Sequence, residues 1–78
     1  MDKKQYGERL KFARLRKSMR QLDVTVALQE YGIDLTQTAI GKIERGERNL
    51  TVHELAAFIE VFDVSADWVI KGWELNIS

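Results

Sequence analysis

Three polar residues, Gln37, Thr38 and Lys42, lie close together in a segment with helical spacing. The carboxamide of Gln37 can donate and accept hydrogen bonds, which matches N6 and N7 of adenine. Thr38 offers a hydroxyl and a methyl group, and Lys42 offers an ammonium that suits guanine O6 and N7 or a phosphate. The segment therefore carries groups of the kind that read base edges, although an ordinary solvated helix face has the same composition.

Other reactive side chains are sparse. The chain has one histidine, His53, and no cysteine, so we expect no structural zinc site, which needs a tetrahedral set of nitrogen or sulfur ligands. The absence of cysteine also excludes disulfides and fits a cytoplasmic setting. The serines are Ser18, Ser65 and Ser78, and none lies in a nucleophile elbow or beside a plausible base. We therefore expect no enzymatic activity, no metal or cofactor and no small-molecule ligand.

The 78 residues suffice for one small domain with a strong charge gradient. The net charge is zero, but residues 1–20 hold eight cations and two anions, whereas residues 51–78 hold one cation and five anions. Solvated helix faces would explain this gradient, and so would a basic side that meets a polyanion. No apolar run approaches the roughly 20 residues that span a bilayer, so we expect no membrane association.

Helical periodicity dominates the chain, and its interruptions predict five helices. Ser18 and Gln21 have the spacing of a capping box at the start of the second helix. The apolar stripe of that helix would consist of Val24, Leu28 and Tyr31. The predicted helices cover residues 3–17, 19–31, 37–45, 52–62 and 66–71.

Hydroxyl residues mark the starts of the last three predicted helices. Thr36 and Ser65 can each accept a hydrogen bond from an unpaired backbone N–H of the first turn. Thr51 and Glu54 form a second capping-box pattern. Gly32 is suited to the left-handed conformation that ends a helix, and we expect it to close the second one.

The third predicted helix has the composition of a helix that enters the DNA major groove. Its apolar residues are only Ala39, Ile40 and Ile43, so it buries a narrow seam and leaves a polar face free. Such a helix needs its seam as an anchor while its first turn projects polar groups toward base edges. Arg48 and Asn49 follow directly and are placed to contact phosphates.

These segments together resemble the XRE-type helix-turn-helix proteins, the family of lambdoid phage repressors and Cro. The stretches that carry the resemblance are GERLKFAR, TQTAIGKIERGER and ELAAFIEVFDVSADWVIKG, within about residues 7–72. The resemblance implies an all-α, five-helix, lambda-repressor-like fold. Residues 1–72 would form the helix-turn-helix DNA-binding domain, and residues 73–78 a C-terminal tail.

The resemblance also implies roles for single residues. The base-contacting positions of the recognition helix fall on the three polar residues described first. Gln21 matches a phosphate-contacting position at the start of the second helix, and Arg14 and Glu44 match a structural ion pair. With Gln21, we assign the phosphate contacts to Arg20, Thr36, Arg48 and Asn49.

The spacing departs from the compact pattern of this family. The steps from Gln21 to Gly32 and from Gly32 to Ile40 are both longer than in that pattern. This predicts a second helix about one turn longer and a wider turn. Gly41 in mid-helix costs about 1 kcal/mol relative to alanine. Either it lets a DNA strand or a neighbouring helix come close, or it is merely tolerated.

We therefore expect a sequence-specific transcriptional regulator, a phage-type repressor that binds a palindromic operator in double-stranded DNA as a homodimer. The alternative is a protein-interaction module on the same fold, such as an antitoxin or an adaptor, which the acidic C-terminal third favours. In the tail, Trp73, Leu75 and Ile77 alternate with other residues. They either fold onto the domain or form a dimer contact.

Overall fold

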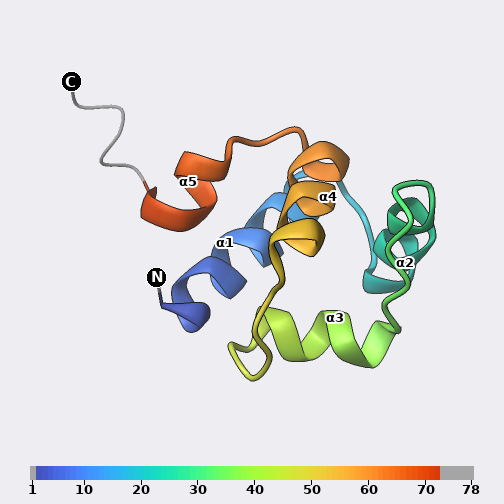
Figure 1. The fold of residues 1–78 in the computed structure, drawn as a ribbon, viewed down its shortest axis with the longest axis horizontal. Coiled ribbons are helices and arrows are strands. Elements are labelled where there is room, and N and C mark those ends of the chain that lie inside the picture. Colours follow the sequence, from blue (N-terminus) through green and yellow to red (C-terminus); the bar gives the residue numbers. More distant parts are fainter. Residues whose placement is uncertain (1, 73–78) are drawn as a thin grey trace.

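The computed structural model describes residues 2–72, and the regular structure in that range is entirely α-helical (Figure 1). The helices are α1 (Lys3–Arg16), α2 (Gln21–Gln29), α3 (Gln37–Glu44), α4 (Val52–Phe62) and α5 (Ala66–Lys71). The predicted all-α, five-helix fold is thus confirmed. The interpretation of Trp73, Leu75 and Ile77 as a folded tail or dimer contact concerns residues outside the described range.

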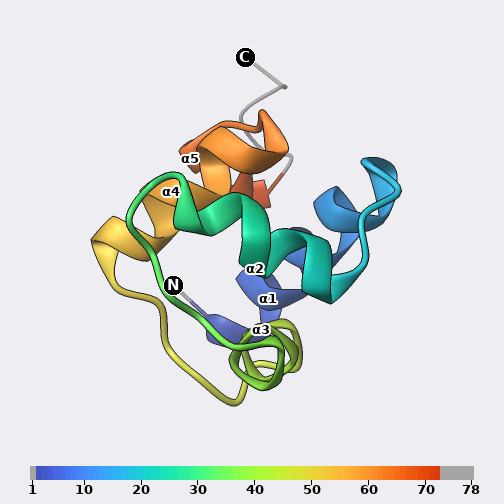
Figure 2. The same cartoon turned by 90° about the vertical axis from the view of Figure 1, so that its right-hand side faces the viewer.

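The helix α1 packs against three of the other helices, and α3 lies at one edge of the molecule. α1 packs against α3, α4 and α5, and α2 packs against α3 and α4. Figures 1 and 2 both place α3 at the lower edge, side-on in the first view and end-on in the second. No helix within residues 2–72 has the length and apolar character needed to cross a bilayer.

One apolar core holds the helices together. Leu10, Leu28, Ile40 and Phe58, from α1 to α4, are all almost completely buried. Full burial of a side chain of this size contributes about 1.5–3 kcal/mol relative to exposure. Val69 brings α5 into the same cluster. The recognition-helix candidate α3 is therefore anchored through the shared core.

The three helix starts predicted from hydroxyl caps are confirmed. The Thr36 hydroxyl accepts a hydrogen bond from the Ala39 N–H at 3.1 Å, and the Ser65 hydroxyl accepts one from the Trp68 N–H at 3.0 Å. In the capping box of α4, the Thr51 side chain accepts from the Glu54 N–H, and the Glu54 carboxylate accepts from the Thr51 N–H. Side chains thus satisfy the first-turn amides that a helix cannot pair internally.

The predicted start of α2 at Met19, capped by Ser18, is wrong. Ser18 has a φ of 56° and belongs to the turn that ends α1, where its N–H donates to the Leu15 carbonyl. Arg20 is the N-cap instead, and its N–H donates to the Asp23 carboxylate at 2.7 Å. The tight turn after α1 therefore shifts the start of α2 two residues along the chain.

The predicted end of α2 at Tyr31 is also wrong. The helix ends at Gln29, and Gly32, with a φ of +77°, closes the turn beyond it. The Ile33 N–H then donates to the Leu28 carbonyl at 3.1 Å. Tyr31 consequently lies outside the helix and is 48% exposed rather than part of the apolar stripe. The extra length of this region lies in the connection to α3, so the expected wide turn is present, but the expected additional turn of the second helix is not.

Candidate nucleic-acid interface

The helix α3 presents an exposed polar face on a buried apolar seam. Gln37, Thr38 and Lys42 are all exposed to solvent. Ile40 and Ile43 on the opposite side are each 1% exposed. The sequence-predicted base-contacting residues therefore lie on one accessible helix, and the seam fixes the direction in which they point.

A buried ion pair attaches the end of α3 to α1 and α2. Arg14 Nε donates to Glu44 Oε2 at 2.6 Å, and Arg14 Nη2 donates to Glu44 Oε1 at 3.1 Å. The two side chains are only 10% and 6% exposed. Gln21 Nε2 also donates to Glu44 Oε1, at 3.1 Å, and Arg14 Nη1 donates to the Met19 carbonyl. The carboxylate of Glu44 thus fixes α3 relative to both neighbouring helices.

Two glycines allow the backbones of α1 and α3 to approach closely. A Cβ atom at Gly7 would collide with the carbonyl oxygen of Ile43. A Cβ atom at Gly46, which follows α3, would lie 2.7 Å from Lys4 Cα. The exposed Lys4 therefore sits at the end of the candidate interface. Lys4 is one of the eight cations in residues 1–20 and was not among the predicted DNA contacts.

Gly41 forms the floor of a shallow hollow between α2 and α3. A Cβ atom there would lie 3.1 Å from Arg45 Nη1 and 3.6 Å from Gln21 Nε2. The hollow has a volume of about 320 Å³ and is lined by Gln21, Gln37, Thr38, Gly41 and Arg45. Because Gly41 has no side chain, the side chains of Arg45 and Gln21 can lie close to its backbone.

Arg45 belongs to this surface, although the sequence reasoning did not select it. Gln37, Gly41 and Arg45 recur at intervals of four residues, which places them along one side of α3. This four-residue spacing, which is visible in the sequence, could have placed Arg45 on the same side of the helix as Gln37. The guanidinium of Arg45 pairs with Glu47, and the Nε–Oε2 distance is 3.1 Å. This contact lowers the pKa of Glu47 below its usual range, and the charge of Lys42 adds to the shift.

The predicted phosphate-contacting residues at the starts of α2 and α3 lie beside the polar face. Gln21 is half-buried, while Thr36 is exposed at the first turn of α3. The side chain of Arg20 is 77% exposed and pairs with Asp23 at 3.0 Å. The hydrogen bonds from Arg20 hold the pKa of the Asp23 carboxyl below its usual range.

The remaining two predicted phosphate contacts lie in the loop after α3. Asn49 is exposed. Arg48 is more constrained, because its two Nη atoms each donate to a different oxygen of Glu54 at 3.0 Å. Its side chain is 33% exposed, and that of Glu54 is 12% exposed. The Arg48 hydrogen bonds are the main reason that the pKa of Glu54 is lowered.

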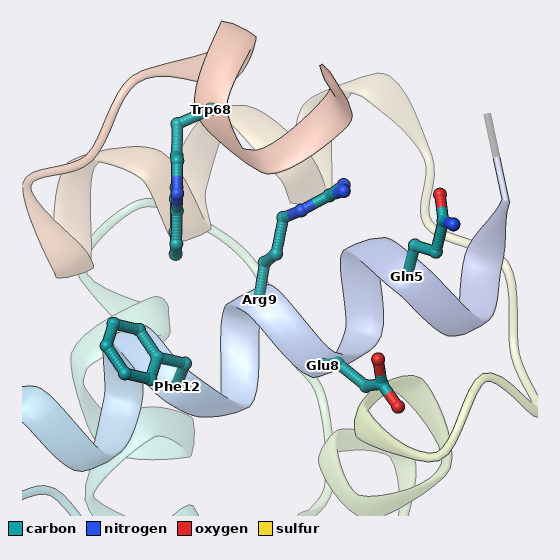
Figure 3. Close-up of a pocket in the computed structure, with 5 residues that line it drawn as sticks. All are labelled: Gln5, Glu8, Arg9, Phe12 and Trp68. Carbon is teal, nitrogen blue, oxygen red and sulfur yellow. The ribbon is translucent and has the colours of Figure 1, made fainter. Parts of the chain in front are cut away.

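A second hollow lies between α1 and α5 (Figure 3). It has a volume of about 350 Å³ and is lined by Gln5, Glu8, Arg9, Phe12 and Trp68. Arg9 reaches from α1 toward α5, where its Nη1 donates to the carbonyl oxygens of Val69 and Ile70. The Arg9 charge therefore stabilises the end of α5. Within the described range, no cluster of three or more potential metal-ligating side chains occurs.

Comparison with known proteins agrees with this arrangement. A family model described as helix-turn-helix matches residues 10–69, which is more than half of the chain and includes all of α2, α3 and α4. A search of curated protein sequences finds no match. The fold, the exposed α3 and the extent of the matched region lead to one assignment: the chain belongs to the XRE-type helix-turn-helix family of DNA-binding regulators.

Proposed function

We propose that this protein is a sequence-specific transcriptional repressor that binds a palindromic operator as a homodimer. The observation that carries the proposal is the geometry of α3, whose polar face is exposed while its seam is buried. In each copy α3 would lie in the major groove. Gln37, Thr38 and Lys42 would then contact base edges, which differ among the four base pairs in that groove.

The phosphate contacts would set the position of α3 on the duplex. Gln21 and Thr36 lie at the N-terminal ends of α2 and α3, where backbone amides and the helix dipole favour a phosphate. Arg20, Arg48 and Asn49 would contact the DNA backbone on either side. Such contacts orient a protein but carry no sequence information by themselves.

The small size of one module supports the proposed dimerisation. A single α3 contacts few base pairs, whereas two linked modules bind with a high effective concentration at the second half-site. Two copies related by a twofold axis would place their recognition helices in successive major grooves, about 34 Å apart. Occupation of such an operator would block access by RNA polymerase.

A protein-interaction module on the same fold is the second candidate. The observation that favours it is the pairing of Arg20, Arg45 and Arg48 with carboxylates. A DNA-binding surface normally gains affinity from arginines that reach phosphates. A protein-interaction module does not bind phosphates, so it does not need arginines that are free of carboxylate partners.

Selection from a pool of random duplexes distinguishes the two functions. The repressor proposal predicts enrichment of a sequence with two symmetric half-sites whose spacing reports the dimer. It also predicts that binding weakens with salt, with a log–log slope near −0.9 per neutralised phosphate. No enrichment together with no salt-dependent binding would favour the interaction module.

A further inference from the structure

Arg20 and Arg48, which are predicted phosphate contacts, and Arg45, which directly follows α3, are each held by a carboxylate of the same chain. The shortest nitrogen–oxygen distances in the three pairs are 3.0–3.1 Å. The pairs are Arg20–Asp23 at the start of α2, Arg45–Glu47 just after α3, and Arg48–Glu54 between the following loop and the start of α4.

The same nitrogen atoms that would bind a phosphate are engaged in these pairs. In every pair two guanidinium nitrogens donate to the two carboxylate oxygens, at 3.0–3.3 Å. Arginine presents this same fork to carboxylates and to phosphates. A phosphate must therefore displace the carboxylate, or approach the arginine from another side with a negative charge close by.

Lys42, unlike the three arginines, is not paired with a carboxylate of the described residues. Lys42 lies on the exposed face of α3 and forms no ion pair with any residue in the range 2–72. Arg45, which directly follows α3 as its C-cap residue, is engaged by Glu47. Lys42, a predicted base contact, is thus free of ion pairs within residues 2–72, whereas Arg20, Arg45 and Arg48 are each paired with a carboxylate.

We propose that Asp23, Glu47 and Glu54 mask these arginines from phosphates and so keep the affinity for DNA of arbitrary sequence low. This inference rests on the proposed DNA-binding function. Nonspecific binding is almost entirely electrostatic, so it depends on cations that are free to contact the backbone. With the arginines masked, Gln37 and Thr38 contribute a larger share of the total binding. The exposed pairs Arg20–Asp23 and Arg45–Glu47 are weak, so a phosphate held in register by base contacts can still displace their carboxylates.

Glu47→Gln tests the masking most cleanly. The side chain of Glu47 caps no helix, and the backbone N–H of Glu47, which donates to the Lys42 carbonyl at the end of α3, is unaffected by the substitution. The experiment measures the affinity of the full chain for a labelled random-sequence duplex over a range of salt concentrations. We expect tighter binding and a log–log salt slope steeper by up to about 0.9, for one added phosphate contact. The gain in affinity should then shrink about 3.5-fold between roughly 50 and 200 mM salt.

Two further variants separate masking from a general change of charge. Asp34→Asn also removes one negative charge close to the start of α3, but Asp34 forms no ion pair within residues 2–72. The double variant Arg45→Gln with Glu47→Gln has the net charge of the natural chain and no arginine to release. We expect Asp34→Asn to give a smaller gain than Glu47→Gln, and the double variant to give none.

Two results would overturn the inference. One is a gain for Glu47→Gln that is no larger than that for Asp34→Asn, and the other is a gain that persists without Arg45. In either case salt-dependent binding by the natural chain would leave the proposed function standing. If neither the natural chain nor Glu47→Gln binds any duplex, the inference and the proposed function both fail.

Discussion

Arg14 and Glu44 connect α1 to α3 through a two-pronged ion pair that is shielded from solvent. The same carboxylate accepts a hydrogen bond from Gln21 at the start of α2. The first three helices therefore meet at one charged group. Because α3 is short and buries only a narrow seam, this contact fixes the angle at which its polar face leaves the domain.

Loss of Glu44 should be severely destabilising. Glu44→Ala leaves the Arg14 guanidinium buried without its counter-charge, which typically costs about 3–5 kcal/mol. Urea titration should show this loss in the free energy of unfolding, and Glu47→Gln, which breaks an exposed pair, should change it far less. Replacement of both partners, Arg14→Met with Glu44→Leu, should recover much of the loss because no charge is stranded. Equal stabilities of Glu44→Ala and Glu47→Gln would contradict this role.

The two mid-helix glycines should respond to alanine in opposite directions. At Gly7 the added methyl group meets the backbone carbonyl of Ile43, so we expect a loss of about 1–3 kcal/mol despite the better helix propensity of alanine. At Gly41 the nearest atom is the end of the flexible Arg45 side chain, so the helix propensity should dominate and stabilise by up to about 1 kcal/mol. Thermal unfolding of the two variants provides the test. A stabilised Gly7→Ala would show that α1 and α3 are not in close contact.

Acid should weaken the contact between Arg48 and Glu54. The folded state lowers the pKa of Glu54, so this group stabilises the fold above its unfolded-state pKa and loses that contribution as the pH falls through the lower, folded-state value. We expect Glu54→Gln to be less stable than the natural chain near neutral pH, with the difference shrinking below about pH 4.5. Denaturant titrations across this range measure the effect.

A matched control for this pH dependence is Glu60→Gln. Glu60 is exposed on the same helix and forms no ion pair within the described part of the chain. Its replacement breaks no ion pair, so it should change the free energy of unfolding near neutral pH less than Glu54→Gln does. A pH-independent difference between Glu54→Gln and the natural chain would show that the Arg48 contact contributes little.

The helix starts that the sequence predicted correctly are those governed by local chemistry. Thr36, Thr51 and Ser65 cap the helices that follow them, because a hydroxyl at an N-cap needs only the next three residues to act. The start of α2 could not be predicted in this way. There Ser18 adopts a left-handed conformation in the turn that ends α1, and Asp23 satisfies the N–H of Arg20 instead.

In the candidate site too, the features set by local sequence were predictable, and those set by the path of the chain were not. Exposure of Gln37, Thr38 and Lys42 followed from the narrow apolar seam of their helix, which is a local pattern. The pairing of Arg48 with Glu54 depends on how the loop after α3 returns to α4. The sequence therefore identified the polar face but not the carboxylates that surround it.

The central claim is that α3 reads base edges in the major groove. The most direct test is the affinity of Gln37→Ala for the duplex selected from the random pool and for its single-base variants. Gln29→Ala, which removes an exposed glutamine at the end of α2, is the matched control. The account predicts a loss of about 1–3 kcal/mol for Gln37→Ala and relaxed preference at one base pair of each half-site. If Gln37→Ala binds the selected duplex as tightly and as selectively as Gln29→Ala, α3 does not contact bases through this residue.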